Sequence, residues 1–196
     1  MKRKFLQNTL SLKKGFTLIE TLVAISILVV AIVGPMEIAS KGLSSAFYAR
    51  DEITAYYLGQ EALEVVRNTR DNAYIEHLKT AGGVSGSWLD PLRACIDDTN
   101  GCSVEVGDTD VLVPCSSGSK CGSPLRLAFD VNDEMSRYSY SSGEGTKFKR
   151  VVKIIPDSAE NSATVEATVS WSTGGVFSLT RQFVIKERLY NWQLRE

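Results

Sequence analysis

The chain has very few histidines and a net charge close to zero. Its one histidine, His77, disfavours catalysis that needs two imidazoles. The net charge of −1 gives no overall basicity of the kind that nucleic-acid binders show. Hydrophobic residues make up 43% and charged residues 23%, which argues against wholesale disorder. A chain of 196 residues is long enough for one domain, or for one domain with an appendage.

Acidic side chains are absent from the first fifteen residues. The five basic residues there give this segment a charge of +5; they are Lys2, Arg3, Lys4, Lys13 and Lys14. Residues 16–196 carry the other 17 basic and all 23 acidic residues, a net charge of −6. A basic head on an acidic body is the asymmetry expected of a membrane-targeted chain.

The next segment, Phe16–Met36, is almost entirely apolar. Its only polar side chains are Thr17, Glu20, Thr21 and Ser26. About 20 apolar residues are enough for a helix to cross the hydrocarbon core of a bilayer. Because basic residues precede the segment, the positive-inside rule favours a cytoplasmic amino terminus. We therefore expect one pass through the cytoplasmic membrane, with the rest of the chain outside the cytoplasm.

A secretory signal peptide fits this segment poorly. Such a peptide ends in small residues in an Ala-x-Ala pattern, whereas the apolar run ends in Gly34-Pro35-Met36-Glu37. A carboxylate at the depth of Glu20 costs about 2.5–3.5 kcal/mol on insertion scales, so it should have a partner. An ordinary signal anchor with a chance glutamate is the simpler alternative.

Residues 13–20, Lys-Lys-Gly-Phe-Thr-Leu-Ile-Glu, resemble the processing site of type IV pilins and type II secretion pseudopilins. The resemblance implies cleavage between Gly15 and Phe16 by a prepilin peptidase and methylation of the new amine on Phe16. It also implies that Glu20 attracts the amino terminus of a neighbouring subunit during assembly. An α-amine has a pKa of roughly 7.7–8.0, so it stays mostly charged at neutral pH, and a buried cation needs a buried anion.

The function implied is that of a structural filament subunit, a minor pilin or pseudopilin, and not of an enzyme. Its implied partners are the prepilin peptidase, other pilins or pseudopilins and the pilus or secretion assembly platform. Its implied location is the inner membrane first and the pilus, pseudopilus or cell surface afterwards. Two alternatives remain: a permanently anchored ectodomain that binds a ligand or partner outside the cytoplasm, and a major pilin.

The chain divides into four predicted segments: a cleaved leader at 1–15, a transmembrane or filament-core helix at 16–39, an amphipathic helix at 40–72 and a globular head at 73–196. Gly34-Pro35 should kink or locally open the helix. Residues 55–64 are similar to minor pilins of the PilV type and to the I-type subunits of type II secretion. We expect one face of the second helix to pack on the head, formed by Ala46, Ala49, Ile53, Tyr56, Leu63 and Val66.

Four cysteines lie within 27 residues of the head, at Cys95, Cys102, Cys115 and Cys121. In an exported segment they indicate two disulfides, for which three pairings exist. We favour Cys95–Cys102 and Cys115–Cys121, because the residues inside each pair are typical of tight loops. Zinc is the competing interpretation, but no Cys-x2-Cys pair is present and His77 lies away from the cluster.

Strand patterns dominate from Leu125 to the carboxyl terminus. Runs at 125–129, 147–155, 164–171 and 177–185 alternate between apolar and polar residues and predict an antiparallel meander with one apolar face. With the long helix packed on that face, the fold class is α+β with a pilin-like ladle architecture. Tyr190 and Trp192 are expected to fill the rim of the core.

Three further patterns have weaker functional interpretations. Residues 130–134 crowd oxygen ligands into one loop, where an ordinary turn is favoured over a calcium site, and we expect no cofactor. Lys147, Lys149 and Lys153 fall on the outward side of one predicted strand. We interpret them as a solvated face and expect no nucleic-acid partner. His77 sits in no nucleophile motif, so no catalytic triad is predicted.

Overall fold

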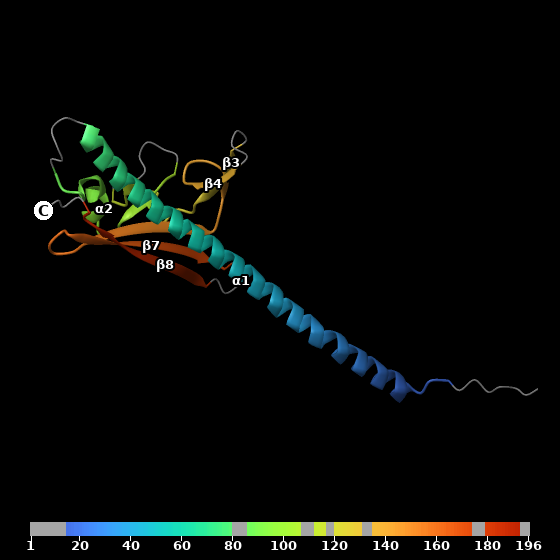
Figure 1. The fold of residues 1–196 in the computed structure, drawn as a ribbon. Coiled ribbons are helices and arrows are strands. Elements are labelled where there is room, and N and C mark those ends of the chain that lie inside the picture. The colour runs from blue at the N-terminus through green and yellow to red at the C-terminus, as the bar shows by residue number, and fades with distance from the viewer. Residues whose placement is uncertain are drawn as a thin grey trace, which may run out of the picture. The chain divides into compact units, whose positions relative to one another are not determined.

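The computed structural model describes residues 15–79, 86–106, 112–116, 120–130, 135–173 and 179–192. The chain forms two compact units, Met1–Ala49 and Arg50–Glu196. Helix α1 (Leu18–Lys79) contributes to both units, and Figure 1 shows its course along the chain. The expected leader at residues 1–14 lies outside the described residues.

The backbone of α1 is helical without a break through Gly34 and Pro35. The local opening that we expected at this point is therefore absent from the described helix. Proline removes one amide donor and crowds the preceding turn, but the remaining hydrogen bonds on either side are enough to keep the helix continuous. Bending at Pro35 stays a prediction.

The larger sheet has five antiparallel strands in the order β2-β1-β6-β7-β8. They are β1 (Cys102–Val104), β2 (Leu112–Pro114), β6 (Phe148–Pro156), β7 (Ser162–Ser172) and β8 (Thr180–Tyr190). The last three strands form the expected meander, in which Val169 pairs with Arg150 on one side and with Phe183 on the other. The α+β architecture with a long helix and antiparallel sheets is thus confirmed.

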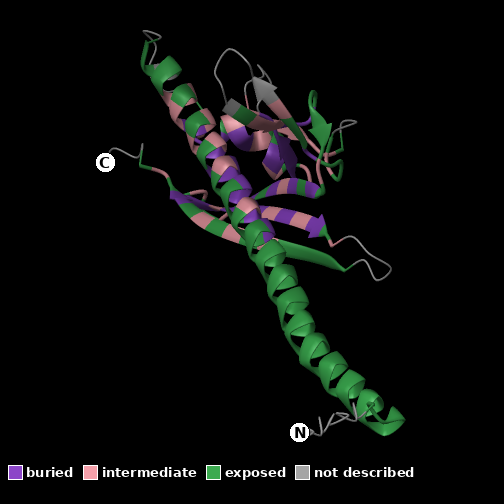
Figure 2. Ribbon diagram, turned by 90° about the vertical axis from the view of Figure 1, so that its right-hand side faces the viewer, coloured by how far each residue is buried: buried purple, intermediate pink, exposed green. Residues whose placement is uncertain are grey.

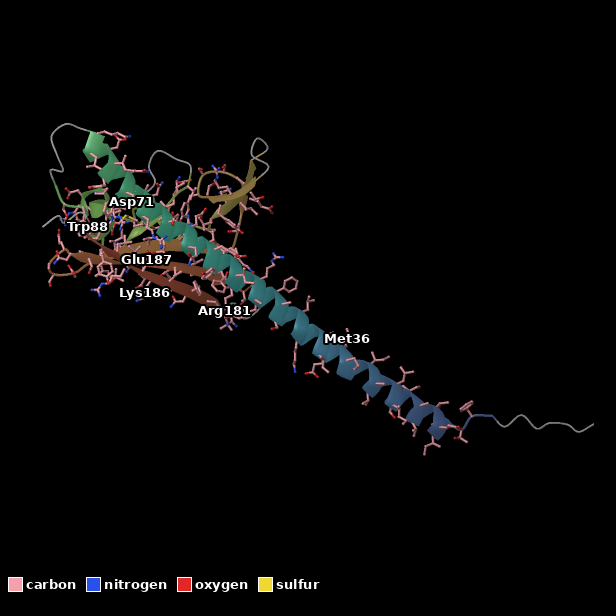
Figure 3. The ribbon with its side chains drawn as sticks, viewed as in Figure 1. Met36, Asp71, Trp88, Arg181, Lys186 and Glu187 are labelled. Atoms are coloured by element: carbon pink, nitrogen blue, oxygen red, sulfur yellow. A yellow bond between two sulfur atoms is a disulfide. The ribbon has the colours of Figure 1, made fainter. Side chains whose placement is uncertain are left out.

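The strand predicted at 125–129 is present as β3 (Arg126–Asp130), but it does not join the meander. It belongs to a smaller antiparallel sheet of order β4-β3-β5, in which β4 (Met135–Ser139) and β5 (Glu144–Gly145) were not indicated by the sequence patterns. The short helices η1 (Asp90–Leu92) and α2 (Arg93–Ile96) follow α1. They are held at the β6–β7 hairpin, where the indole of Trp88 (Figure 3) donates to the carbonyl of Glu160 at 2.6 Å.

The core of the second unit lies between α1 and the larger sheet, where Figure 2 shows buried residues on both elements. The inward positions of β6 and β7 are buried as predicted; they are Phe148, Val152, Ile154, Val165, Ala167, Val169 and Trp171.

The predicted helix face is wrong in its first half. Leu63 and Val66 are buried, but Ile53 and Tyr56 are 57% and 43% exposed, and Ala46 and Ala49 are exposed as well. The face that packs on the sheets is instead made by Ala55, Leu58, Gly59, Ala62, Leu63 and Val66. Helical spacing did not single out this face, which packs because Ala55 and Gly59 let the helix come close to the sheet. A Cβ atom at Gly59 would lie 2.9 Å from Cγ2 of Ile185 on β8, so only glycine fits there without a shift.

The end of the chain also differs from its prediction. Leu179 precedes β8 and is 61% exposed, while Tyr190 and Trp192 are 61% and 53% exposed. These two aromatic residues do not fill the core; Leu189 does, with 4% exposure. Trp192 contacts the ring of Tyr74 on α1 edge-on, with 4.6 Å between centroids. A ring on the surface of α1 gives the indole partial cover outside the core.

Candidate processing and assembly site

The residues singled out by the resemblance lie together at the start of α1. Gly15, Phe16 and Thr17 precede the helix, and the helix begins at Leu18. Phe16 is 78% exposed, and the peptide bond before it belongs to no helix or strand. Cleavage of that bond would leave an α-amine two residues before the helix.

Thr17 caps the helix. Its hydroxyl oxygen accepts a hydrogen bond from the backbone amide of Glu20 at 3.3 Å, and its carbonyl accepts one from the amide of Thr21 at 3.2 Å. The sequence Thr-x-x-Glu is the pattern of a capping box, in which the hydroxyl satisfies an amide that has no partner within the helix. This function of Thr17 was missed in the sequence analysis, although the three-residue spacing to Glu20 signals it.

Glu20 lies in the first turn of α1. The amino-terminal end of a helix carries partial positive charge, which favours a carboxylate at this position. No cation forms an ion pair with Glu20 among the residues that the structure describes. The hydroxyls of Thr21 and Ser26 donate to carbonyls of the preceding turn, each at 2.8 Å. Glu20 is therefore an exposed acidic group in an apolar turn, without an ion pair to any residue that the structure describes.

Every residue of the helix from Leu18 to Arg50 is exposed (Figure 2). The described part of the chain contains one helix that is long and apolar enough to cross a membrane, with a mean hydropathy of 2.4 in its most apolar window. A long apolar helix near the amino terminus fits a membrane-anchored, single-pass protein. Met36, labelled in Figure 3, is 71% exposed at the end of the apolar run.

The cysteines form two disulfides in the second unit. The bonds join Cys95 to Cys102 and Cys115 to Cys121, which is the pairing that we favoured. Asp98 connects the two loops, because its carboxylate accepts hydrogen bonds from the amides of Asn100 at 2.9 Å and Ser116 at 2.5 Å. Hydrogen bonds lower the pKa of the Asp98 carboxyl, and those from Ser116 contribute more than those from Asn100.

Ion pairs connect the second half of α1 to the larger sheet. Arg67 binds Glu187 of β8, with nitrogen–oxygen distances of 2.5 and 2.8 Å. Glu187 is labelled in Figure 3. This hydrogen bonding raises the pKa of Arg67. Lys147 binds Asp51 at 2.5 Å, so it faces the helix and does not belong to the outward lysines as predicted. Lys149 and Lys153 are exposed, as expected of a solvated face.

The other candidate residues from the sequence do not form a site in the described part of the structure. Residues 131–134 of the proposed calcium loop lie outside the described residues, as do the side chains of Asp130 and His77. Within the residues that the structure describes, no three His, Cys, Asp or Glu side chains are grouped as metal ligands would be.

A family model described as the prokaryotic N-terminal methylation motif matches residues 10–34. The match includes Gly15, Phe16, Thr17 and Glu20, and it covers a short part of the chain. We found no match among curated proteins or among solved structures. The matched residues are those that form the exposed junction and the capped first turn of α1. The chain therefore carries the prokaryotic N-terminal methylation motif at the residues that resemble the processing site of type IV pilins and pseudopilins.

Proposed function

We propose that this chain is a minor pilin or pseudopilin, cleaved between Gly15 and Phe16, methylated on Phe16 and assembled into a type IV pilus or a type II secretion-like filament. The match of the methylation motif to residues 10–34 is the observation that carries this proposal. The exposed, non-helical junction at Phe16 supports it, because a peptidase needs an accessible backbone.

The first helical segment would have two successive environments. Before assembly its apolar surface is covered by lipid, and after assembly the same surface is covered by copies of the helix. Apolar side chains gain little from exchanging lipid for protein, so packing and polar contacts must decide whether helices associate. Glu20 is the acidic group available for such a contact, and the methylated amine of Phe16 in a neighbouring subunit is the cation.

Low copy number is supported by the segment between α1 and β3, which carries two disulfides and the short helices. We propose that this segment makes contacts beyond those that repeat along the filament, which are the only ones a major subunit needs. The number of copies per filament, counted by quantitative mass spectrometry, tests this part of the proposal. A subunit present at every position of the filament would be a major pilin.

The test of Glu20 uses two substitutions that separate its charge from its place in the capping box. Gln occurs at this position of capping boxes, so Glu20→Gln keeps the local hydrogen bonding and removes the charge. Glu20→Ala removes both. An unpaired buried charge costs about 3 kcal/mol or more, so we expect both variants to enter filaments about 100-fold less than the unchanged chain.

Membrane insertion serves as the control, because removal of a charge from the apolar segment does not hinder it. Equal assembly of Glu20→Gln and the unchanged chain would refute the charge role of Glu20. A permanently anchored ectodomain would be indifferent to both substitutions.

A further inference from the structure

Strand β8 is the open edge of the larger sheet. It stands last in the order β2-β1-β6-β7-β8, and Figure 1 shows it as the outermost strand. All 11 residues of Thr180–Tyr190 pair with β7 in one register, without a bulge. Among the strands that the structure describes, none pairs with the outer edge of β8. A long, regular edge of this kind is a template for another strand.

Two backbone hydrogen bonds at the ends of the β7–β8 pair fix which groups of β8 point away from β7. The amide of Asn191 donates to the carbonyl of Asn161 at 2.8 Å, and the amide of Thr173 donates to that of Leu179 at 3.1 Å. In an antiparallel pair, residues bonded in this way alternate with residues whose backbone groups point to the other side. The odd-numbered residues of β8 therefore bond to β7. The amides and carbonyls of the even-numbered residues within 182–188 point outward from the sheet.

The side chains of these even-numbered residues lie on the face of the sheet opposite to α1. Glu187, an odd-numbered residue, binds Arg67 of α1, and side chains alternate between the two faces along a strand. Lys186 and Arg188 therefore project from the opposite face, and both are exposed. This side of β8 carries two cations and no carboxylate, so a second β8 would bring only like charges to it. A strand with acidic side chains on this face is complementary to it.

Arg188 is positioned to bind a carboxylate. Its Nε donates to the hydroxyl of Ser162 at 3.1 Å, and its guanidinium carbon lies 5.9 Å from the centre of the Tyr190 ring. Lys186 binds Glu166 of β7 at 2.6 Å, whereas no carboxylate among the described residues forms an ion pair with Arg188. A guanidinium held at Nε still offers its two terminal nitrogens, and their planar arrangement matches the two oxygens of a carboxylate.

The face of β8 that α1 covers is apolar near its edge. Phe183 meets the ring of Tyr56 on α1 edge-on, with 5.8 Å between centroids. Tyr56 remains 43% exposed. A strand added to β8 would lie about 4.8 Å beyond it, and its helix-facing side chains would then cover part of this ring. A strand suited to both faces therefore alternates acidic with apolar residues.

We infer that the open edge of β8 binds an extended segment of a different protein, in which acidic residues alternate with apolar ones. Main-chain hydrogen bonds to residues 182–188 provide affinity, while Arg188 and Tyr56 select the side chains. A protein segment fits this edge better than a nucleic acid does, because a phosphate backbone has no amides to pair with the outward carbonyls. The inference is independent of cleavage after Gly15 and of filament assembly, so either can fail without the other.

Amide hydrogen exchange of the full chain in detergent micelles, followed by NMR, tests this edge. In the chain alone, the amides of Gln182, Val184 and Lys186 should exchange faster than those of Phe183 and Ile185, which bond to β7. The probe is a short peptide in which glutamate alternates with valine. At about ten times its dissociation constant the peptide leaves roughly one site in eleven free, so the outward amides should exchange about tenfold more slowly. The amides bonded to β7 should not change.

Two control peptides separate strand addition from simple charge attraction. One has the same composition with all its glutamates at one end, and the other carries N-methyl groups on the amides that would face β8. Neither should slow the outward amides. Arg188→Glu should weaken binding of the alternating peptide about tenfold, because like charges opposite each other repel. Lys149→Glu is the matched control, since it makes the same charge reversal on exposed β6, and it should change binding by less than about twofold.

The inference is overturned if the alternating peptide leaves the outward amides unchanged, or if the N-methylated peptide slows them equally. Equal binding by Arg188→Glu and Lys149→Glu would also contradict it. So would binding of double-stranded DNA or of phosphatidylglycerol vesicles at Arg188 without binding of the peptide. Slow exchange at Phe183 and Ile185 in Arg188→Glu shows that the variant is folded, so that its weaker binding reports the lost contact and not unfolding.

Discussion

Arg150 on β6 is completely buried, and its guanidinium binds the Glu61 carboxylate of α1 at 2.5 Å. The same group donates to the carbonyl oxygen of Leu58 on α1 at 3.1 Å and to that of Val104 on β1 at 2.7 Å. One side chain therefore joins the helix to two strands of the larger sheet. A buried charge of this kind requires its partners, because removal of one leaves the other unpaired in a poorly solvated environment.

Glu61→Ala should lower the free energy of unfolding of the second unit by about 3 kcal/mol. The buried Arg150 then keeps its carbonyl contacts and loses its counter-charge. Denaturant unfolding of the full chain in detergent measures the change. Glu64→Ala is the matched control, because Glu64 lies three residues further on α1, and its ion pair with Arg67 is exposed. The control should change stability by less than about 1 kcal/mol, and equal losses would contradict this account of Arg150.

The two disulfides should differ in their response to reductant. Cys95 and Cys102 are 1% and 0% exposed inside the core, whereas Cys115 and Cys121 are only partly buried. Thiol–disulfide exchange requires access of the attacking thiolate to a sulfur atom. In a titration with dithiothreitol followed by alkylation and mass spectrometry, Cys115–Cys121 should open first. Opening of Cys95–Cys102 should coincide with unfolding, and its earlier opening in the folded chain would be the contrary result.

Acid should destabilise the second unit through Glu105. Burial acts to raise the pKa of this carboxyl, but hydrogen bonds from Lys120, Ser141 and the amide of Tyr140 outweigh it and lower the pKa overall. A carboxyl with a lowered folded pKa contributes its full stability above its ordinary value, roughly 4.3, and loses it as pH falls through the folded value. We expect the midpoint temperature of unfolding to decrease once the pH is lowered below about 4.

Glu105→Gln should be less stable than the unchanged chain at pH 7 and should lose less stability on acidification. Unfolding midpoints measured at pH 7 and pH 3 give this comparison. A decrease of the same size in both proteins would show that other groups dominate the acid response.

Thr17 should determine where α1 begins. Thr17→Ala removes the hydroxyl that accepts the Glu20 amide, at a cost of about 1 kcal/mol to the first turn. Faster hydrogen exchange at the amides of Glu20 and Thr21, measured by NMR in micelles, is the expected sign of fraying. Thr17→Ser keeps the hydroxyl and should exchange like the unchanged chain. Unchanged exchange in Thr17→Ala would exclude the cap as the determinant.

Much of the second unit was predictable from the sequence because its strands alternate strictly. Burial of Val165, Ala167, Val169 and Trp171 follows from a period of two, and the cysteine pairing follows from two short loops. The motif at residues 13–20 was recognisable because it is compact and contains an unusual glutamate in an apolar run.

The buried side of α1 was not predictable in the same way. Helical spacing alone allows several apolar faces, and the large side chains of Ile53 and Tyr56 drew the prediction toward the wrong one. The structure selects the face with Ala55 and Gly59, because small residues let β8 come close. Contacts such as Glu61 with Arg150 join residues 89 positions apart, a separation that periodicity does not reveal.

The mass of the amino-terminal peptide of the protein, purified from its native membrane, tests the central claim most directly. Our account predicts a mature chain that begins at Phe16 and carries one methyl group on its α-amine. A chain that keeps residues 1–15 would contradict it and would identify a permanently anchored ectodomain.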